Sequence, residues 1–271
     1  MDGTSDQLTK LRRVGVIGVG AIGAALVEAL LTGPRAGQIE VVLSPRSAVR
    51  AAALADRFDR VRVADDNQGV VDDSDVVVLA VLPAQVREVG AALTFRADQV
   101  VIGLAAGWPP SLLTPVVAPA SHVTQLIPLP VIALHAGPVV LHPASPAVEW
   151  LLKGCGELVV LEQERDIIVL SCASATMSSF FELQKTVLGW MTDRGLPPTL
   201  SRDYLSALFG GLATEAASVP VERLVDFPVE HETPGGLNEQ VRLALTRTGT
   251  FDELRRELDA LHRDRMQKMP G

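Results

Sequence analysis

A glycine-rich turn near the start of the chain constrains the fold more than any other feature. An apolar run at residues 14–17 leads into Gly18, Gly20 and Gly23, spaced as Gly-x-Gly-x-x-Gly, and a helix-like segment follows at 24–31. In such a turn the first glycine permits a sharp bend after a strand, the second lets the backbone approach a pyrophosphate, and the third lets helix and strand pack closely. The N–H groups at the helix start then face phosphate oxygens. The segment predicts a dinucleotide-binding Rossmann fold.

The end of the next predicted strand distinguishes between the two nicotinamide cofactors. The apolar run 39–43 is followed by Ser44, Arg46 and Ser47, with no acidic residue among positions 44–47. An Asp or Glu at this place binds the ribose 2′-hydroxyl of NAD, whereas a hydroxyl and an arginine suit a 2′-phosphate. We therefore expect NADPH as the cofactor. The alternative is that Arg46 is a solvated loop charge and that Ser44 caps the helix that follows.

Apolar β-branched runs alternate with helical segments through the first part of the chain. Continuous runs such as 75–81 and 99–103 are typical of strands covered on both faces of a parallel sheet. From residue 165 onward these runs stop and helical periodicity takes over. We expect an α/β fold, with a Rossmann-type, doubly wound, mostly parallel sheet in residues 1–163 and an all-helical domain in residues 164–271, and a substrate cleft between them. Further strand candidates are residues 61–63, 122–127, 138–141 and 158–161.

Charge and composition exclude several classes of partner. The net charge of −8 comes without a basic cluster, so nucleic acid is not expected as a partner. The two cysteines lack metal-ligand spacing, which favours a metal-free protein of the reducing cytoplasm. Prolines interrupt the long apolar stretch 126–141, and residues 1–9 are too polar for a secretory signal and predict a frayed tail. We expect a cytoplasmic protein that acts on a small molecule and makes no membrane contact.

A loop late in the chain has the composition of an anion site. In the segment 233–238, Thr233 is expected to cap a helix, Pro234 to occupy its first turn, and the N–H groups from Gly235 to Asn238 to remain free. Such a helix start suits a substrate carboxylate. The alternative is an ordinary helix start after a turn.

These motifs occur in the order found in the pyrroline-5-carboxylate reductase family, which the chain resembles over nearly its whole length. The matching segments are the glycine turn, residues 75–83, 104–107 and 195–197, and the Thr-Pro-Gly-Gly at 233–236, which is similar to the family's Ser-Pro-Gly-Gly substrate loop. The resemblance implies NADPH-dependent reduction of a cyclic imine carboxylate by hydride transfer to C=N, as in proline biosynthesis. It also implies a homodimer through the helical domain, sometimes assembled further.

The resemblance also assigns roles to individual positions. Substrate contacts are expected from Thr233, Gly235, Gly236, Leu237 and Asn238. Cofactor contacts are expected from Gly18, Gly20, Ala21, Ile22, Gly23, Ser44, Arg46, Ser47, Asn67, Ala80, Val81, Leu82, Pro83, Ala105, Ala106 and Gly107.

Departures from the family pattern lie near the expected substrate. Leu82 replaces a lysine, and Leu237 and Asn238 replace two threonines, so a related imine or a keto acid is also a candidate substrate. His231 beside Glu232 is a candidate proton donor, and Asn238 is a second candidate catalytic residue.

Two further side chains keep rival functions open. Lys185 is placed like the lysine acid of β-hydroxyacid dehydrogenases, which leaves a hydroxy-acid dehydrogenase as an alternative, although a solvated helix charge is the plainer interpretation. Tyr204 is either a proton donor or a packing residue. The altered substrate half also allows a catalytically silent NADP(H)-binding sensor.

Overall fold

The computed structural model describes residues 12–267, and the chain divides between Ile167 and Ile168 into two compact units. The sequence predicts a boundary at residue 163. The prediction of a frayed tail at residues 1–9 lies outside the described part of the chain. Each unit is described below by itself.

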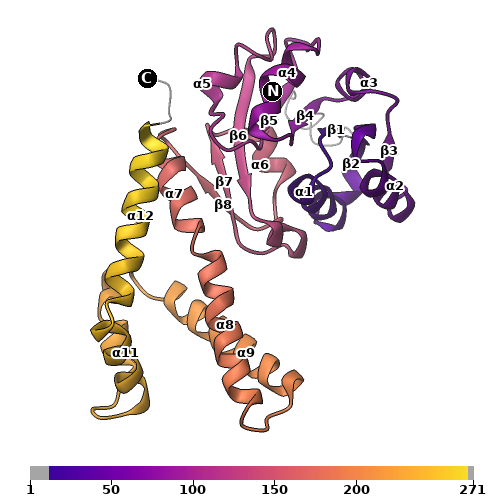
Figure 1. Cartoon of the computed structure of the whole chain (residues 1–271). Helices are drawn as coiled ribbons and strands as arrows, with labels where there is room; N and C mark the ends of the chain where they lie inside the picture. Colours follow the sequence, from indigo (N-terminus) through magenta and orange to yellow (C-terminus); the bar gives the residue numbers. More distant parts are fainter. Residues whose placement is uncertain (1–11, 268–271) are drawn as a thin grey trace, which may run out of the picture. The chain divides into compact units, whose positions relative to one another are not determined.

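The first unit contains an eight-stranded sheet with the strand order β3-β2-β1-β4-β5-β6-β7-β8 (Figure 1). All neighbouring strands are parallel except β6 and β7, which are antiparallel. The strand order reverses beside β1, so the loops after β1 and β4 border the crevice where ligands bind in doubly wound sheets. The predicted α/β fold class is confirmed. The strands are β1 Arg12–Ile17, β2 Ile39–Leu43, β3 Val61–Val63, β4 Val76–Leu79, β5 Val100–Gly103, β6 His122–Pro128, β7 Pro138–His142 and β8 Glu157–Val160.

Helices cover both faces of this sheet because alternate strand residues point to opposite sides. In β4, Val76 and Val78 belong to one apolar cluster, and Val77 and Leu79 belong to the other. The first cluster includes residues of α1, α2 and α6, and the second includes residues of α3, α4 and α5. Each fully buried Val or Leu contributes roughly 1.5–3 kcal/mol of burial free energy. The helices are α1 Ala21–Thr32, α2 Ala48–Arg57, α3 Asn67–Asp72, α4 Val86–Ala91, α5 Pro110–Leu113 and α6 Pro146–Leu151, with short 3-10 turns η2 Ala36–Gln38, η3 Pro45–Ser47, η4 Pro83–Gln85 and η5 Pro130–Leu134.

The second unit is entirely helical. The helices α8 and α9 form a hairpin that turns at Gly195 (φ 88°), and the rings of Phe180 and Phe209 meet edge to face with centroids 5.5 Å apart. The helices α11 and α12 form a second hairpin around Gly249 (φ 74°). The elements are α7 Asp166–Ser174, α8 Met177–Thr192, α9 Pro198–Ala217, η6 Val221–Val225, α10 Phe227–Glu230, α11 Leu237–Arg247 and α12 Thr250–Gln267.

This helical unit has almost no core of its own. Among residues 168–267, the buried apolar side chains are Cys172, Met191 and Leu205. Large apolar side chains lie open on several helices, including Phe181 at 64% exposure and Val225 at 78%. An apolar surface of this extent is typical of an interaction site, because isolated soluble domains keep such patches small.

One helical span in the described residues is long and apolar enough to cross a membrane by length and composition. It runs through Asp166–Thr192, whereas the sequence predicts no membrane-spanning segment. The span consists of two helices, α7 and α8, which a turn at residues 175–176 separates. An apolar helix that packs in a protein interface passes the same test.

Candidate functional site

The glycine turn lies between β1 and α1, at the carboxyl edge of the sheet. Gly18 has φ 100°, and a Cβ atom there would lie 2.6 Å from the carbonyl oxygen of Ala80. A Cβ atom on Gly23 would collide with the carbonyl oxygen of Gly18, so these two positions need glycine for the turn and for packing. A Cβ atom on Gly20 would meet nothing within 4 Å. The space at Gly20 is therefore open to a ligand.

The start of α1 offers hydrogen-bond donors beside this space. Gly20 is the N-cap of α1 and provides no side-chain cap, and Ala21 and Ile22 begin the helix. The first N–H groups of a helix have no acceptor within the helix, and the helix dipole favours an anion next to them. This end of α1 therefore fits a pyrophosphate.

Ser44 joins the loop after β2 to the glycine turn. Its buried hydroxyl oxygen accepts a hydrogen bond from the N–H of Gly18 at 3.0 Å. Ser44 makes no side-chain cap, so the alternative role as a helix cap is wrong, because the hydroxyl faces β1 instead. Arg46 and Ser47 follow in η3, and the guanidinium of Arg46 lies on the exposed side of this loop.

Side chains also join the loop after β5 to the loop after β4 and to strand β6. The indole N–H of Trp108 donates to the carbonyl oxygen of Pro83 at 2.8 Å. The amide of Gln125, a buried side chain in β6, donates to the carbonyl oxygen of Ala105 at 3.1 Å. Gly107, in the loop after β5, has φ 76°, a conformation that favours glycine.

The predicted cofactor residues therefore gather along one edge of the sheet. The turn after β1, the loops after β2, β4 and β5, and Asn67 at the start of α3 all follow carboxyl ends of parallel strands. Sequence reasoning missed Trp108 and Gln125. The available indication is that Gln125 is a polar residue within a predicted strand of the sheet core, since buried polar side chains need a partner.

The predicted anion loop in the helical unit folds differently from expectation. Thr233 is not the cap: α11 begins at Leu237, with Gly236 as N-cap and no side-chain cap. Pro234 lies in the preceding turn, which Gly236 closes by donating its N–H to the carbonyl oxygen of Thr233 at 2.7 Å. The reason is Gly235, whose φ of 74° is incompatible with a continuing helix.

The N–H groups of this loop are only partly free. Gly235 donates its N–H to the carboxylate of Glu239 in the first turn of α11, at 2.5 Å. The N–H of Gly236 is taken within the turn, so two of the four N–H groups expected to be free have partners. Leu237 is 80% exposed. The loop therefore already binds one carboxylate of the same chain, that of Glu239.

Two of the candidate catalytic side chains, Asn238 and Lys185, have polar partners within the helical unit. Asn238 donates its side-chain amide to the carbonyl oxygen of His231 at 2.9 Å, so these two are brought together. Lys185 pairs with Glu182 at 3.0 Å on an exposed side of α8. Tyr204 is an exposed residue of α9. Their catalytic roles remain predictions.

His231 and Glu232 each have a charged partner. The imidazole of His231 contacts the carbonyl oxygen of Phe227 at 2.9 Å through Nδ1 and the carboxylate of Glu215 at 3.1 Å through Nε2. The backbone hydrogen bond first, and then Glu215, raise the pKa of His231 above its ordinary value. The Arg242 guanidinium binds Glu232 through both oxygens, at 2.5 and 2.9 Å, and lowers the pKa of that carboxyl.

We predict that Glu215→Gln lowers the pKa of His231, measured by NMR titration of its ring protons. The raised pKa means that protonated His231 stabilises the fold below its ordinary pKa of 6.5, and this contribution is lost as the pH rises through the folded-state value. The variant should therefore lose stability at acidic pH and little at alkaline pH. Glu257→Gln in α12 serves as the matched control. An unchanged His231 titration in Glu215→Gln would contradict the pairing.

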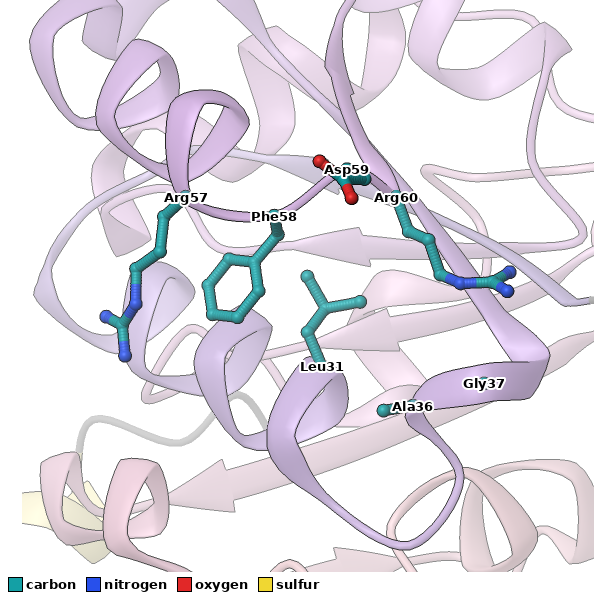
Figure 2. A pocket seen from close by; sticks show the side chains of 7 residues that line it. All are labelled: Leu31, Ala36, Gly37, Arg57, Phe58, Asp59 and Arg60. Atoms are coloured by element: carbon teal, nitrogen blue, oxygen red, sulfur yellow. The ribbon is translucent and has the colours of Figure 1, made fainter.

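A cavity of about 310 Å³ lies away from these loops (Figure 2). Its lining residues lie at the ends of α1 and α2 or just before β2 and β3. The cavity therefore lies at the amino edge of these strands. Figure 2 shows the two arginines on either side of Phe58 and Leu31. This cavity is not part of the candidate site. It is lined by Leu31, Ala36, Gly37, Arg57, Phe58, Asp59 and Arg60.

The sheet, the glycine turn and the loops around it define an oxidoreductase fold of the nicotinamide-dinucleotide type. A family model described as "NADP oxidoreductase coenzyme F420-dependent" matches residues 13–107, which supports the predicted NADP cofactor.

The whole chain is similar to pyrroline-5-carboxylate reductases. It is 25% identical over 231 residues to the enzyme of Mycobacterium leprae, covering 80% of this chain and 76% of that relative. The structure of the Streptococcus pyogenes enzyme matches with a TM-score of 0.77 at 19% identity, covering 94% of this chain and 98% of that one. That of Plasmodium falciparum, with NADP bound, matches with a TM-score of 0.78 at 15% identity, covering 97% and 100%. The predicted resemblance is confirmed as a similarity of sequence and fold: the chain has the fold of these reductases.

Proposed function

We propose that the protein is an NADPH-dependent reductase of a cyclic imine carboxylate, similar to pyrroline-5-carboxylate. The observation that carries this proposal is the set of loops along the carboxyl edge of the sheet, where Gly20 leaves room for a pyrophosphate beside the start of α1. Arg46 and Ser47 would hold the 2′-phosphate, and the Ala105–Gly107 loop would line the nicotinamide. The cofactor would supply the hydride. The hydroxy-acid dehydrogenase gains no support from Lys185, whose ammonium pairs with Glu182.

Imine reduction by hydride transfer requires few catalytic side chains. A protonated imine accepts hydride readily, so orientation of the substrate is the main contribution required. His231 and Asn238 lie on either side of the Thr233–Gly236 turn in sequence, and the Asn238 amide donates to the carbonyl oxygen of His231. We propose that this loop orients the substrate carboxylate and that His231 stabilises the conformation of the loop. The raised pKa of His231 favours its protonated, cationic form, which suits an anionic substrate.

Glu239 is expected to weaken the binding of an anionic substrate. Its carboxylate takes the N–H of Gly235 and places a negative charge at the positive end of α11. We predict that Glu239→Gln lowers KM for 1-pyrroline-5-carboxylate by about two- to fivefold with little change in kcat. The imine 1-pyrroline, which lacks the carboxylate, should show no such gain, and Glu253→Gln at the start of α12 is the matched control. Equal changes for both imines would contradict a carboxylate site at this loop.

We also propose that the helical unit forms a homodimer. The support is its open apolar surface: α8 exposes Phe181 and Trp190, and α11 exposes Val241. Three buried apolar side chains among residues 168–267 cannot balance the conformational entropy of ordering these helices. A second copy offers the same surface, so a two-fold pairing would cover both.

The proposed activity is tested by steady-state kinetics with NADPH and a panel of cyclic imines, imine carboxylates, keto acids and hydroxy acids. We expect turnover of cyclic imine carboxylates, with kcat/KM higher for NADPH than for NADH. Turnover of hydroxy acids alone would support a hydroxy-acid dehydrogenase instead. Tight NADPH binding without turnover of any panel member would support a silent sensor.

A further inference from the structure

Two loops that flank the glycine turn are linked by a pair of polar side chains. Arg46 lies in η3 after β2, and Gln85 ends η4 after β4, while β2 and β4 are the two neighbours of β1. With its amide oxygen directed at the guanidinium, Gln85 accepts hydrogen bonds from Nη1 and Nη2 of Arg46 at 3.0 and 3.3 Å. The pair therefore spans the carboxyl end of β1, where the glycine turn begins.

The turn that carries Gln85 is held by hydrogen bonds and by the core, whereas the side chain of Arg46 is exposed. The N–H of Gln85 donates to the carbonyl oxygen of Leu82 at 2.8 Å, and the next residue, Val86, is buried in the core. The same short turn is held from the other side by Trp108, whose indole N–H binds the carbonyl oxygen of Pro83. Arg46 is exposed on its loop. The backbone that carries Gln85 is therefore held in place, which suits Gln85 as the partner that positions the exposed side chain of Arg46.

The neutral charge of Gln85 matters for an arginine that binds an anion. A free arginine side chain loses up to about 2 kcal/mol of rotamer entropy when it becomes ordered. An amide oxygen orders the guanidinium beforehand and leaves its full positive charge, whereas a carboxylate at the same place would pair with the arginine and compete with a phosphate. Two of the five N–H donors of Arg46 face Gln85, and the others remain for a ligand.

We propose that Gln85 is a positioning residue that sets the preference for NADPH over NADH. It holds the Arg46 guanidinium against the loop after β4, oriented to receive the 2′-phosphate of the cofactor. This inference rests on the proposed NADPH cofactor, and it concerns cofactor selection and not the imine. Because NADH lacks the 2′-phosphate, the contribution of Gln85 belongs to NADPH alone.

The test measures dissociation constants of the full-length protein for NADPH and for NADH from nicotinamide fluorescence, which needs no imine. We expect Gln85→Glu to weaken NADPH binding by about tenfold or more, and Gln85→Ala by about two- to fivefold. NADH binding should change by less than about twofold in both variants. Arg46→Ala gives the full effect of losing the arginine, and Gln163→Glu, at an exposed position after β8, is the matched charge control. Thermal unfolding of each variant verifies that the fold is retained.

Equal loss of NADPH and NADH affinity in the Gln85 variants would overturn the inference, because it would indicate a structural role for η4. An unchanged ratio of the two affinities in Gln85→Glu would do the same. In either case, a wild-type preference for NADPH would leave the proposed cofactor intact. A wild-type protein that binds both cofactors equally would contradict the proposed cofactor itself, and with it the inference.

Discussion

Replacing Gly18 by alanine is expected to abolish NADPH binding and to lower the free energy of unfolding by roughly 1–3 kcal/mol. The φ of 100° at Gly18 is unfavourable for any residue with a Cβ atom, and the new atom would lie 2.6 Å from the carbonyl oxygen of Ala80. The turn must therefore shift, and with it the Gly18 N–H that binds Ser44. The measurements are thermal or urea unfolding and fluorescence titration with NADPH.

Gly20→Ala is the matched variant that separates folding from cofactor binding. Its Cβ atom would meet nothing within 4 Å, so the variant should unfold at nearly the wild-type temperature. If the backbone of Gly20 lies against a pyrophosphate, the added methyl group should still weaken NADPH binding by about tenfold or more. Wild-type affinity for NADPH in Gly20→Ala would contradict the predicted position of the cofactor.

The double variant Phe181→Asp with Val241→Asp is expected to be monomeric, with a helical unit that unfolds at low temperature. Both side chains are large, apolar and exposed in the single chain, at 64% and 61%. If a second copy buries them, charged replacements place unpaired carboxylates in the interface and raise the dimer dissociation constant by about 100-fold or more. Light scattering after size-exclusion chromatography measures the mass, and circular dichroism measures the loss of helix.

The control for this prediction is Val49→Asp, the same kind of change at an exposed position of α2 in the other unit. It should leave the mass and the unfolding temperature unchanged. A double variant that keeps the mass of a dimer would show that these two faces lie outside the interface. A wild-type chain that is monomeric at micromolar concentration would contradict the proposed homodimer.

The sequence predicts the parts of the fold that follow from local pattern. The turn around Gly18, Gly20 and Gly23 is encoded by adjacent residues, and the continuous apolar run of β4 requires cover on both faces. The contact of Arg46 with Gln85 and the contact of Trp108 with Pro83 do not follow from local pattern. These partners lie on different loops, and side-chain direction at the end of a strand does not follow from hydrophobic periodicity.

In the helical unit, the sequence predicts the helices but not how they pack. Periodicity predicts the helices α8, α9 and α12, but it does not say that most of their apolar side chains lack a partner within one chain. The start of α11 was predicted too early because Thr233 and Pro234 are typical of helix starts, whereas the left-handed conformation of Gly235 delays the helix to Leu237. The role of Glu239 at this helix start follows only from the folded geometry.

The central claim is that the protein transfers hydride from NADPH to the carbon of a C=N bond. The most direct measurement uses NADPH that carries deuterium at both hydrogen positions of nicotinamide C4, with 1-pyrroline-5-carboxylate as substrate and mass spectrometry of the product. We predict that the product gains one deuterium on the former imine carbon, one for each NADPH oxidised, and that the product of Gly18→Ala gains none. Bound cofactor with no deuterium in any product of the imine panel would contradict the claim.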